Sequence, residues 1–139
     1  MSFNQMLGQW AEQQAQTYLE QHGFQMLQRN YHSRFGEIDL IMSRQDELIF
    51  VEVKARQPSA WGRASEVISL SKQRKIIHTA LVFLQQYPQF NLYALRFDVI
   101  CIDFLQPLAK IPQQSFLASA YDLSWIENAF TFDTNLIRL

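Results

Sequence analysis

The sequence has little of several things that would mark out a special class of protein. Cysteine occurs once, at Cys101, so an internal disulfide bond is excluded. Glycine and proline occur only four times each and hydrophobic residues make up 48% of the chain, which excludes a disordered or low-complexity protein. No apolar run approaches the roughly 20 residues of a membrane-spanning helix, and the first residues lack the basic and apolar stretches of a secretory signal. We therefore expect a single domain over residues 1–139 of a cytoplasmic protein that does not bind membranes.

Charge is also scarce, and it is unevenly placed. Charged residues make up 18% of the chain, and the net charge is −1, which does not indicate a strongly basic nucleic-acid-binding protein. Nine of the 12 lysines and arginines nevertheless lie between residues 29 and 75, where the net charge is +3. This clustering is compatible with a solvated surface and with a face that contacts phosphates.

The hydrophobic pattern predicts an alternation of helices and strands. Residues 3–22 have apolar side chains at helical spacing and end at Gly23, and residues 72–87 form a second amphipathic segment for which Ser71 is a candidate cap. Strands are expected at 24–31, 36–43, 47–55, 93–104 and 123–130, with a hairpin between the second and third of them. This order of elements predicts an α/β fold in which helices flank a mixed β-sheet.

Two of the expected strands carry charges in a regular pattern. Side chains alternate along a strand, so Glu37 and Asp39 should share one face while Ile38 and Leu40 face a core. Glu52 and Lys54 should likewise share a face on the next strand. A two-residue hairpin loop at residues 45–46 would place Asp39 opposite Glu52 and Glu37 opposite Lys54.

Facing carboxylates repel each other unless they share a proton or hold a cation. Oxygen ligands of this kind suit Mg²⁺ or Mn²⁺, and a neighbouring lysine can orient an attacking water and stabilise charge on a phosphoryl group. The pattern of Asp39, Glu52 and Lys54 therefore predicts phosphodiester hydrolysis at a metal centre. The alternative interpretation is a solvated strand face with an ordinary Glu–Lys pair.

These residues also carry a resemblance to a known group of proteins. Asp39, followed after twelve residues by Glu52-Val53-Lys54, resembles the motif of the PD-(D/E)xK nuclease superfamily. Gly8 and Glu12, with residues 36–41, 50–56, 96–100 and 128–130, further resemble the YraN family. That bacterial family consists of endonuclease-like proteins similar in fold to archaeal Holliday junction resolvases.

The resemblance implies a restriction-endonuclease-like core and a set of site residues. Asp39 and Glu52 would be metal ligands, with the carbonyl group of Val53 as a third, and Lys54 would be the catalytic lysine. Glu37 would support the metal or its water. Glu12 matches a helix glutamate that joins the site in resolvase-like relatives, the alternative being an ordinary solvated residue. Because those relatives act as dimers, a homodimer is one expected state of this chain.

The basic segment is the expected nucleic-acid-binding surface. Cations in the first turn of the second helix oppose the helix dipole, a cost that a bound phosphate would offset. The candidate contacts to a nucleic-acid backbone, most simply DNA, are Arg56, Arg63, Lys72, Gln73, Arg74 and Lys75. A solvated basic turn is the alternative.

Three functions remain open on the sequence alone. The first is a Mg²⁺- or Mn²⁺-dependent nuclease, and the second is a nucleic-acid-binding module that retains the fold without turnover. The third is an interaction protein, whose binding would not depend on salt as phosphate contacts do.

Overall fold

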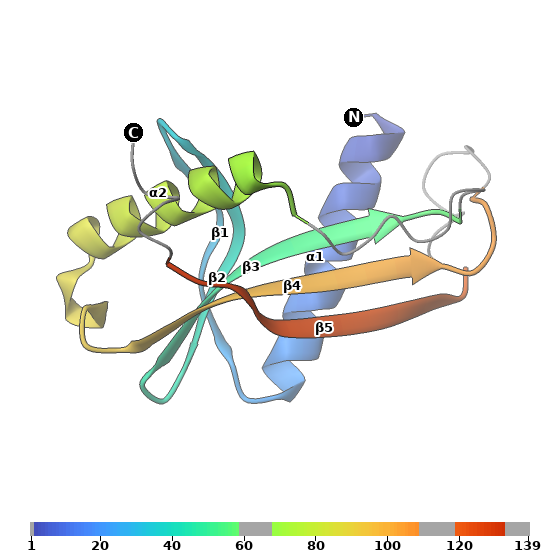
Figure 1. Cartoon of the computed structure of the whole chain (residues 1–139). Helices are drawn as coiled ribbons and strands as arrows, with labels where there is room; N and C mark the ends of the chain where they lie inside the picture. Colours follow the sequence, from blue (N-terminus) through green and yellow to red (C-terminus); the bar gives the residue numbers. More distant parts are fainter. Residues whose placement is uncertain (1, 59–67, 109–118, 133–139) are drawn as a thin grey trace.

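The computed structural model describes residues 2–58, 68–108 and 119–132. Five strands, two α-helices and a short 3₁₀-helix follow one another along this part of the chain (Figure 1). In chain order they are α1 (Phe3–Gln21), β1 (Gln25–Ser33), β2 (Gly36–Arg44), β3 (Glu47–Arg56), α2 (Leu70–Gln86), η1 (Pro88–Phe90), β4 (Ala94–Phe104) and β5 (Tyr121–Phe130). The expected helices and strands are confirmed, including the last strand.

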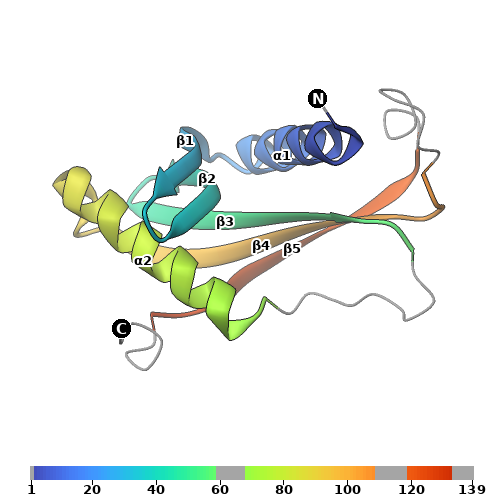
Figure 2. The same cartoon turned by 90° about the horizontal axis from the view of Figure 1, so that it is seen from above.

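The strands form one mixed sheet in the order β1-β2-β3-β4-β5. All neighbours are antiparallel except β3 and β4, which are parallel and are connected through α2. Helix α1 lies over one face of the sheet and α2 over the other (Figure 2). This arrangement is the predicted mixed α/β fold and is consistent with a restriction-endonuclease-like core. Within the described ranges, none of the helices has the length and apolar character needed to span a membrane.

Helix α1 forms where the sequence predicts it, because its N-terminal cap, the spacing of its apolar residues and the glycine after its end all favour the same helix. Ser2 caps the helix through a reciprocal capping box with Gln5. The buried side chains recur every fourth residue and cover the sheet, namely Leu7, Ala11, Ala15 and Leu19. Gly23 follows the helix with a φ of 90°, a conformation that glycine adopts at little cost. The helix thereby fixes one wall of the region where charged strand residues gather.

The β2–β3 hairpin has the predicted register but a shorter ladder than expected. Its pairs run from Arg44 opposite Glu47 at the two-residue turn to Leu40 opposite Val51, and the ladder ends there. Beyond that pair the main-chain N–H of Val53 donates to Oδ2 of Asp39, at 2.8 Å. A carboxylate thus takes the place of a main-chain acceptor, and the two strands part at Asp39.

One expectation about this hairpin is wrong. Ile38 and Leu40 do not share a face, because Ile38 packs in the cluster under α2 and Leu40 in the cluster under α1. The regular alternation is broken at Asp39, which lies beside Asn30 of β1, a residue with a φ of 54°. On β3 the alternation holds, since Val51 and Val53 both belong to the α1 side.

Helix α2 begins two residues earlier than expected, and Ser69 is its cap rather than Ser71. The hydroxyl of Ser69 accepts a hydrogen bond from the main-chain N–H of Lys72, at 3.1 Å. Both serines fit the cap pattern, so the sequence alone did not distinguish them. The earlier start places Lys72 and Lys75 in the first two turns, above strand β3.

Candidate functional site

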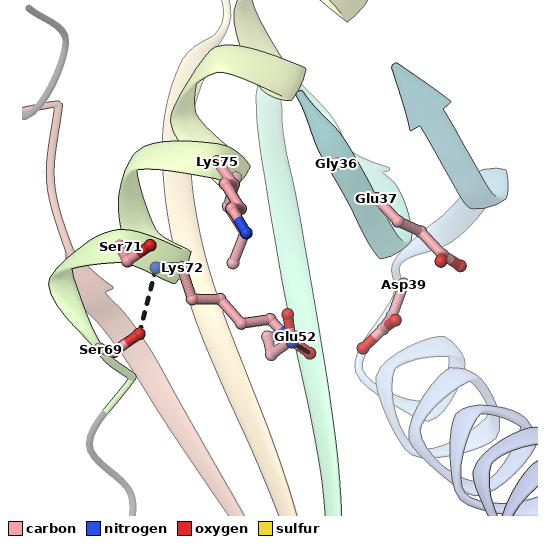
Figure 3. Close-up of a pocket in the computed structure, with 9 residues that line it drawn as sticks. Gly36, Glu37, Asp39, Glu52, Ser69, Ser71, Lys72 and Lys75 are labelled. Atoms are coloured by element: carbon pink, nitrogen blue, oxygen red, sulfur yellow. Dashed lines mark hydrogen bonds and ion pairs between the residues drawn. The ribbon is translucent and has the colours of Figure 1, made fainter. Parts of the chain in front are cut away.

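Two acidic side chains meet where β2 and β3 part. Asp39 lies on β2 beyond the end of the ladder, and Glu52 on β3 is only 8% exposed. They line a cavity of about 400 Å³ together with residues of α2 (Figure 3). The predicted juxtaposition of Asp39 and Glu52 is therefore present, although they face each other across a fork and not across a continuous ladder.

The two carboxyl groups strongly disfavour simultaneous ionisation. Burial, together with the negative charge of Glu52, raises the pKa of Asp39 from 3.8 to about 8. The hydrogen bond from the N–H of Val53 and the charge of Lys72 act in the opposite direction but do not offset these effects. The neutral form of Asp39 is therefore favoured near neutral pH, and a cation in the cavity would favour the ionised form.

The opposite wall of the cavity is cationic. The ammonium group of Lys72 lies 3.1 Å from Oε1 of Glu52, and Lys75 projects into the same space one turn along the helix (Figure 3). The first turn of α2 contains no acidic residue that would favour the helix dipole, and Lys72 opposes it. The negative charge of Glu52 compensates the positive charge of Lys72. The cavity therefore has an acidic wall, formed by Asp39 and Glu52, and a basic wall, formed by Lys72 and Lys75.

Glu37 and Lys54 lie at the margins of this arrangement. Glu37 lines the cavity beside Gly36, but its carboxylate points away from Glu52 and lies 3.9 Å from Nε2 of His32 (Figure 3). Lys54 follows Glu52 by two residues on β3 and is half-buried opposite Cys101 of β4. It is not among the residues lining the cavity, whereas Lys72 and Lys75 of α2 are.

Glu12 approaches the site from the other side of the sheet. Burial raises its pKa, and the negative charge of Asp39 raises it further, while hydrogen bonds from Asn30 and Arg29 lower it. Nε of Arg29 lies 3.5 Å from Oε1 of Glu12. The glutamate is thus near enough to Asp39 to influence its charge, and it is held by residues of β1.

The remaining candidate contacts are dispersed. Arg56 forms an ion pair with Asp103 of β4 at 3.2 Å, and the side-chain amide of Gln73 donates to the carbonyl group of Ile68. Arg74 is exposed on α2. Arg63 lies outside the described residues. Of the six basic or polar candidates, Lys72 and Lys75 are those that line the cavity with the two carboxylates.

The donor set of the cavity fits a hard divalent cation that keeps part of its water shell. No group of three histidine, cysteine, aspartate or glutamate side chains in the described ranges converges on one point. Asp39 and Glu52 supply two oxygen-donor groups, and Mg²⁺ is often held by one or two carboxylates and several waters. A divalent cation would also remove the conflict that keeps Asp39 protonated.

Comparison with known proteins identifies the family. The model of the uncharacterised protein family UPF0102 matches residues 11–102, which include both carboxylates and the start of α2. This chain belongs to the UPF0102 family. A UPF0102 protein of Acinetobacter baumannii strain AYE is 57% identical over 129 residues, covering 93% of this chain and 97% of the relative. A UPF0102 protein of Stutzerimonas stutzeri strain A1501 is 40% identical over 130 residues, covering 94% and 98%.

Sequence reasoning missed some of the residues that shape the UPF0102 site. Asn30 and Arg29, both on β1, hold Glu12. Asn30 has a φ of 54°, a conformation in which asparagine is enriched. An asparagine opposite a strand aspartate was the available signal for the break in alternation.

Proposed function

We propose that this UPF0102 protein is a nuclease that uses Mg²⁺ or Mn²⁺ to hydrolyse phosphodiester bonds in DNA, with branched or otherwise structured DNA among its substrates. The observation that carries the proposal is the cavity in which Asp39 and Glu52 face Lys72 and Lys75. One wall suits a divalent cation and the other suits a phosphate. The resemblance of residues 39–54 to the PD-(D/E)xK motif supports the same conclusion, and the cytoplasm is the expected compartment.

The acidic wall would hold the cation. Asp39 and Glu52 would bind it through carboxylate oxygens, with the main-chain carbonyl of Val53 as a further donor. Such a cation lowers the pKa of bound water and polarises a phosphoryl oxygen. Glu12 and Glu37 would add negative charge around this position, and Asn30 and Arg29 keep Glu12 oriented.

The cationic wall would hold the phosphodiester. Lys72 and Lys75 would bind its non-bridging oxygens, near the first turn of α2, whose main-chain N–H groups attract anions. Lys54, on the same face of β3 as Glu52, would orient the attacking water and accept or return its proton. Arg74, and Arg63 beyond the described residues, would extend the contact to neighbouring phosphates, whereas Arg56 and Gln73 would first have to leave Asp103 and the carbonyl group of Ile68. The reaction is then an in-line displacement by water at phosphorus.

The test is cleavage of a panel of labelled DNAs in Mg²⁺ or Mn²⁺, comprising single strand, duplex, flap and four-way junction. The wild type is compared with Asp39→Asn, Glu52→Gln and Lys54→Ala, and circular dichroism verifies that each variant is folded. We expect cleavage that EDTA abolishes and that each substitution reduces by about 100-fold or more, the range typical of a lost general acid–base group. Cleavage that survives both carboxylate substitutions would refute the proposal.

A nucleic-acid-binding module without turnover is the second candidate. The observation in its favour is that Lys72 already forms an ion pair with Glu52 at 3.1 Å, and that the raised pKa of Asp39 favours its neutral form, so these two carboxyl groups have charge compensation without a metal. This candidate predicts DNA binding that is insensitive to EDTA and to Lys54→Ala, and no cleavage of any substrate in the panel.

A further inference from the structure

The paired carboxylates border two cavities, one on each face of the sheet. Asp39 and Glu52 line the 400 Å³ cavity beneath α2 and also a second cavity of about 290 Å³ beside α1. The two spaces lie on either side of the fork that opens where the β2–β3 ladder ends at Leu40 and Val51. The two carboxylates therefore border a cavity on each face of the sheet, while the hydrogen bond from the N–H of Val53 to Asp39 joins the two strands between them.

The two cavities differ sharply in chemistry. The α2-side cavity contains Lys72 and Lys75, which suit a phosphate. The α1-side cavity has no lysine or arginine among its described lining residues, and small or apolar side chains form most of its wall: Leu7, Gly8, Ala11, Val53 and Ala55. Only Asn4 and Glu12 add polar groups to that wall besides the shared carboxylates. Such a surface suits a sugar or a base and not a second phosphate.

Gly8 lines the α1-side cavity and adds no side chain to it. It lies within helix α1, where glycine is less favourable for stability than alanine. A Cβ placed on Gly8 would meet no other atom within 4 Å, so nothing in the described fold requires the absence of a side chain. The space that Gly8 leaves open therefore serves no packing purpose within the described chain, and it adjoins the carboxylates.

We propose that a single nucleic-acid strand lies across the fork, with its reacting phosphodiester against Lys72 and Lys75 and the adjoining nucleoside in the α1-side cavity at Gly8. This inference rests on the proposed nuclease function and narrows its substrate to unpaired segments, such as an overhang, a flap or the open region of a branched DNA. A cavity of about 290 Å³ is at the small end of ligand pockets, which span roughly 300–1,000 Å³. A volume of this size suits one nucleoside better than a base pair.

The test places the same leucine at two neighbouring positions of α1. Gly8→Leu would fill the α1-side cavity, while Gln9→Leu adds the same side chain at an exposed position outside both cavities. Binding of a labelled single strand and of its duplex is measured by fluorescence anisotropy in EDTA, and cleavage of both is measured in Mn²⁺. Circular dichroism and thermal melting report on the fold of each variant.

We expect the wild type to prefer the single strand. Gly8→Leu should weaken single-strand binding by about tenfold or more, because one base–protein contact is lost, and Gln9→Leu should not. Gly8→Ala should melt at a higher temperature than the wild type and still bind the single strand less tightly, a combination that a purely structural role of Gly8 does not produce.

The possible failures are distinguishable. If the wild type cleaves DNA but Gly8→Leu and Gly8→Ala bind and cleave the single strand as Gln9→Leu does, the inference is overturned and the proposed function stands. A wild type that prefers the intact duplex has the same consequence. If the wild type neither binds nor cleaves any DNA, both are overturned. Should Gly8→Leu fail to fold, Gly8→Ala decides, because its added methyl group has free space.

Discussion

At the scale of single residues, the fold raises the pKa of Asp39 far above the value of an aspartate in water. Its carboxyl group is removed from water, lies beside Glu52, and accepts a hydrogen bond from the main chain of Val53. The raised pKa means that the folded protein binds a proton that the unfolded chain releases. Folding and ionisation at this position therefore oppose each other between about pH 4 and pH 8.

The sign of the resulting pH dependence is fixed by this linkage. Because the pKa of Asp39 is higher in the folded state than in the unfolded chain, the free energy of unfolding should fall as the pH rises from about 4 to 8 in the absence of metal. Urea denaturation at a series of pH values measures it. Asp39→Asn should remove most of this fall, and saturating Mn²⁺ should reduce it in the wild type. Equal pH profiles for wild type and Asp39→Asn would contradict the assignment.

Lys72 and a divalent cation compete for the same carboxylate. The ammonium group lies 3.1 Å from Oε1 of Glu52, so a cation bound there must displace it. Since Lys72 is half-exposed, the ion pair is worth at most about 1 kcal/mol, and Lys72→Met should tighten Mn²⁺ binding by up to about fivefold.

Isothermal titration with Mn²⁺ measures this effect, with Lys75→Met as the control. Lys75 lines the same cavity and carries the same charge, and both lysines are exposed. A gain in Mn²⁺ affinity that is equal in the two variants would show that net charge, and not release of Glu52, is responsible.

At the scale of elements, a buried aspartate joins the last two strands. Asp98 of β4 is fully buried and accepts hydrogen bonds from Nε and Nη2 of Arg96, from the indole N–H of Trp125 and from the main-chain N–H of Asn128. The last two donors belong to β5. All the polar groups involved are satisfied, which is the condition under which a buried charge is tolerated.

Asp98→Asn should therefore destabilise the fold strongly without touching the proposed site. The amide offers one acceptor oxygen where four donors converge, and the guanidinium group of Arg96 loses its buried counter-charge. We expect a loss of about 3 kcal/mol in the free energy of unfolding, measured by urea denaturation. Glu127→Gln removes a partner of Arg96 that is 53% exposed and should cost less than about 1 kcal/mol. Comparable losses in the two variants would contradict this ranking.

The elements themselves were largely predictable from the sequence. The helical spacing of apolar residues that include Leu7, Trp10 and Ala11 predicted α1, and the two-residue turn at residues 45–46 predicted the register of the hairpin. The parting of the strands at Asp39 was not predictable from alternation, because it depends on a side chain that replaces a main-chain acceptor. The alternation of side chains predicts a strand correctly only up to the point where a side-chain contact ends its hydrogen-bonded ladder.

At the scale of the whole molecule, the basic residues that line the proposed site are few. Lys72 and Lys75 lie in the cavity and Arg74 lies on the same turn of α2, while Arg56 is engaged with Asp103. About three neutralised phosphates on a single strand predict a slope of roughly −2 in a plot of the logarithm of the binding constant against that of the salt concentration. Fluorescence anisotropy at increasing NaCl measures this slope.

Lys75→Met should make the slope shallower by about 0.7, the contribution of one phosphate contact on a single strand. Gln85→Met, at the far end of α2 and outside the cavity, should leave the slope unchanged. A wild-type slope near zero would favour the interaction-protein hypothesis over phosphate recognition.

The site could be predicted in part because some of its contacts are made within one hairpin and others across a long connection. Asp39 and Glu52 belong to one hairpin, so their proximity follows from the sequence and the turn. The approach of Lys72 to Glu52 depends on how the connection between β3 and β4 returns over the sheet, which no local pattern specifies. For the same reason the sequence pointed to Lys54 as a lysine within reach of the carboxylates and did not reveal the ion pair of Lys72 with Glu52.

The hairpin and the crossover also differ in how much chain must close before their strands can pair. A hairpin closed by two residues forms on a microsecond timescale, whereas a parallel pair joined through a helix must first close a long loop. The pairing of Asp39 with Glu52 therefore requires only a short loop to close, whereas the contact of Lys72 with Glu52 requires the whole crossover. If the two carboxylates repel each other when the hairpin closes, Asp39→Asn should refold faster than the wild type at neutral pH, which stopped-flow fluorescence measures.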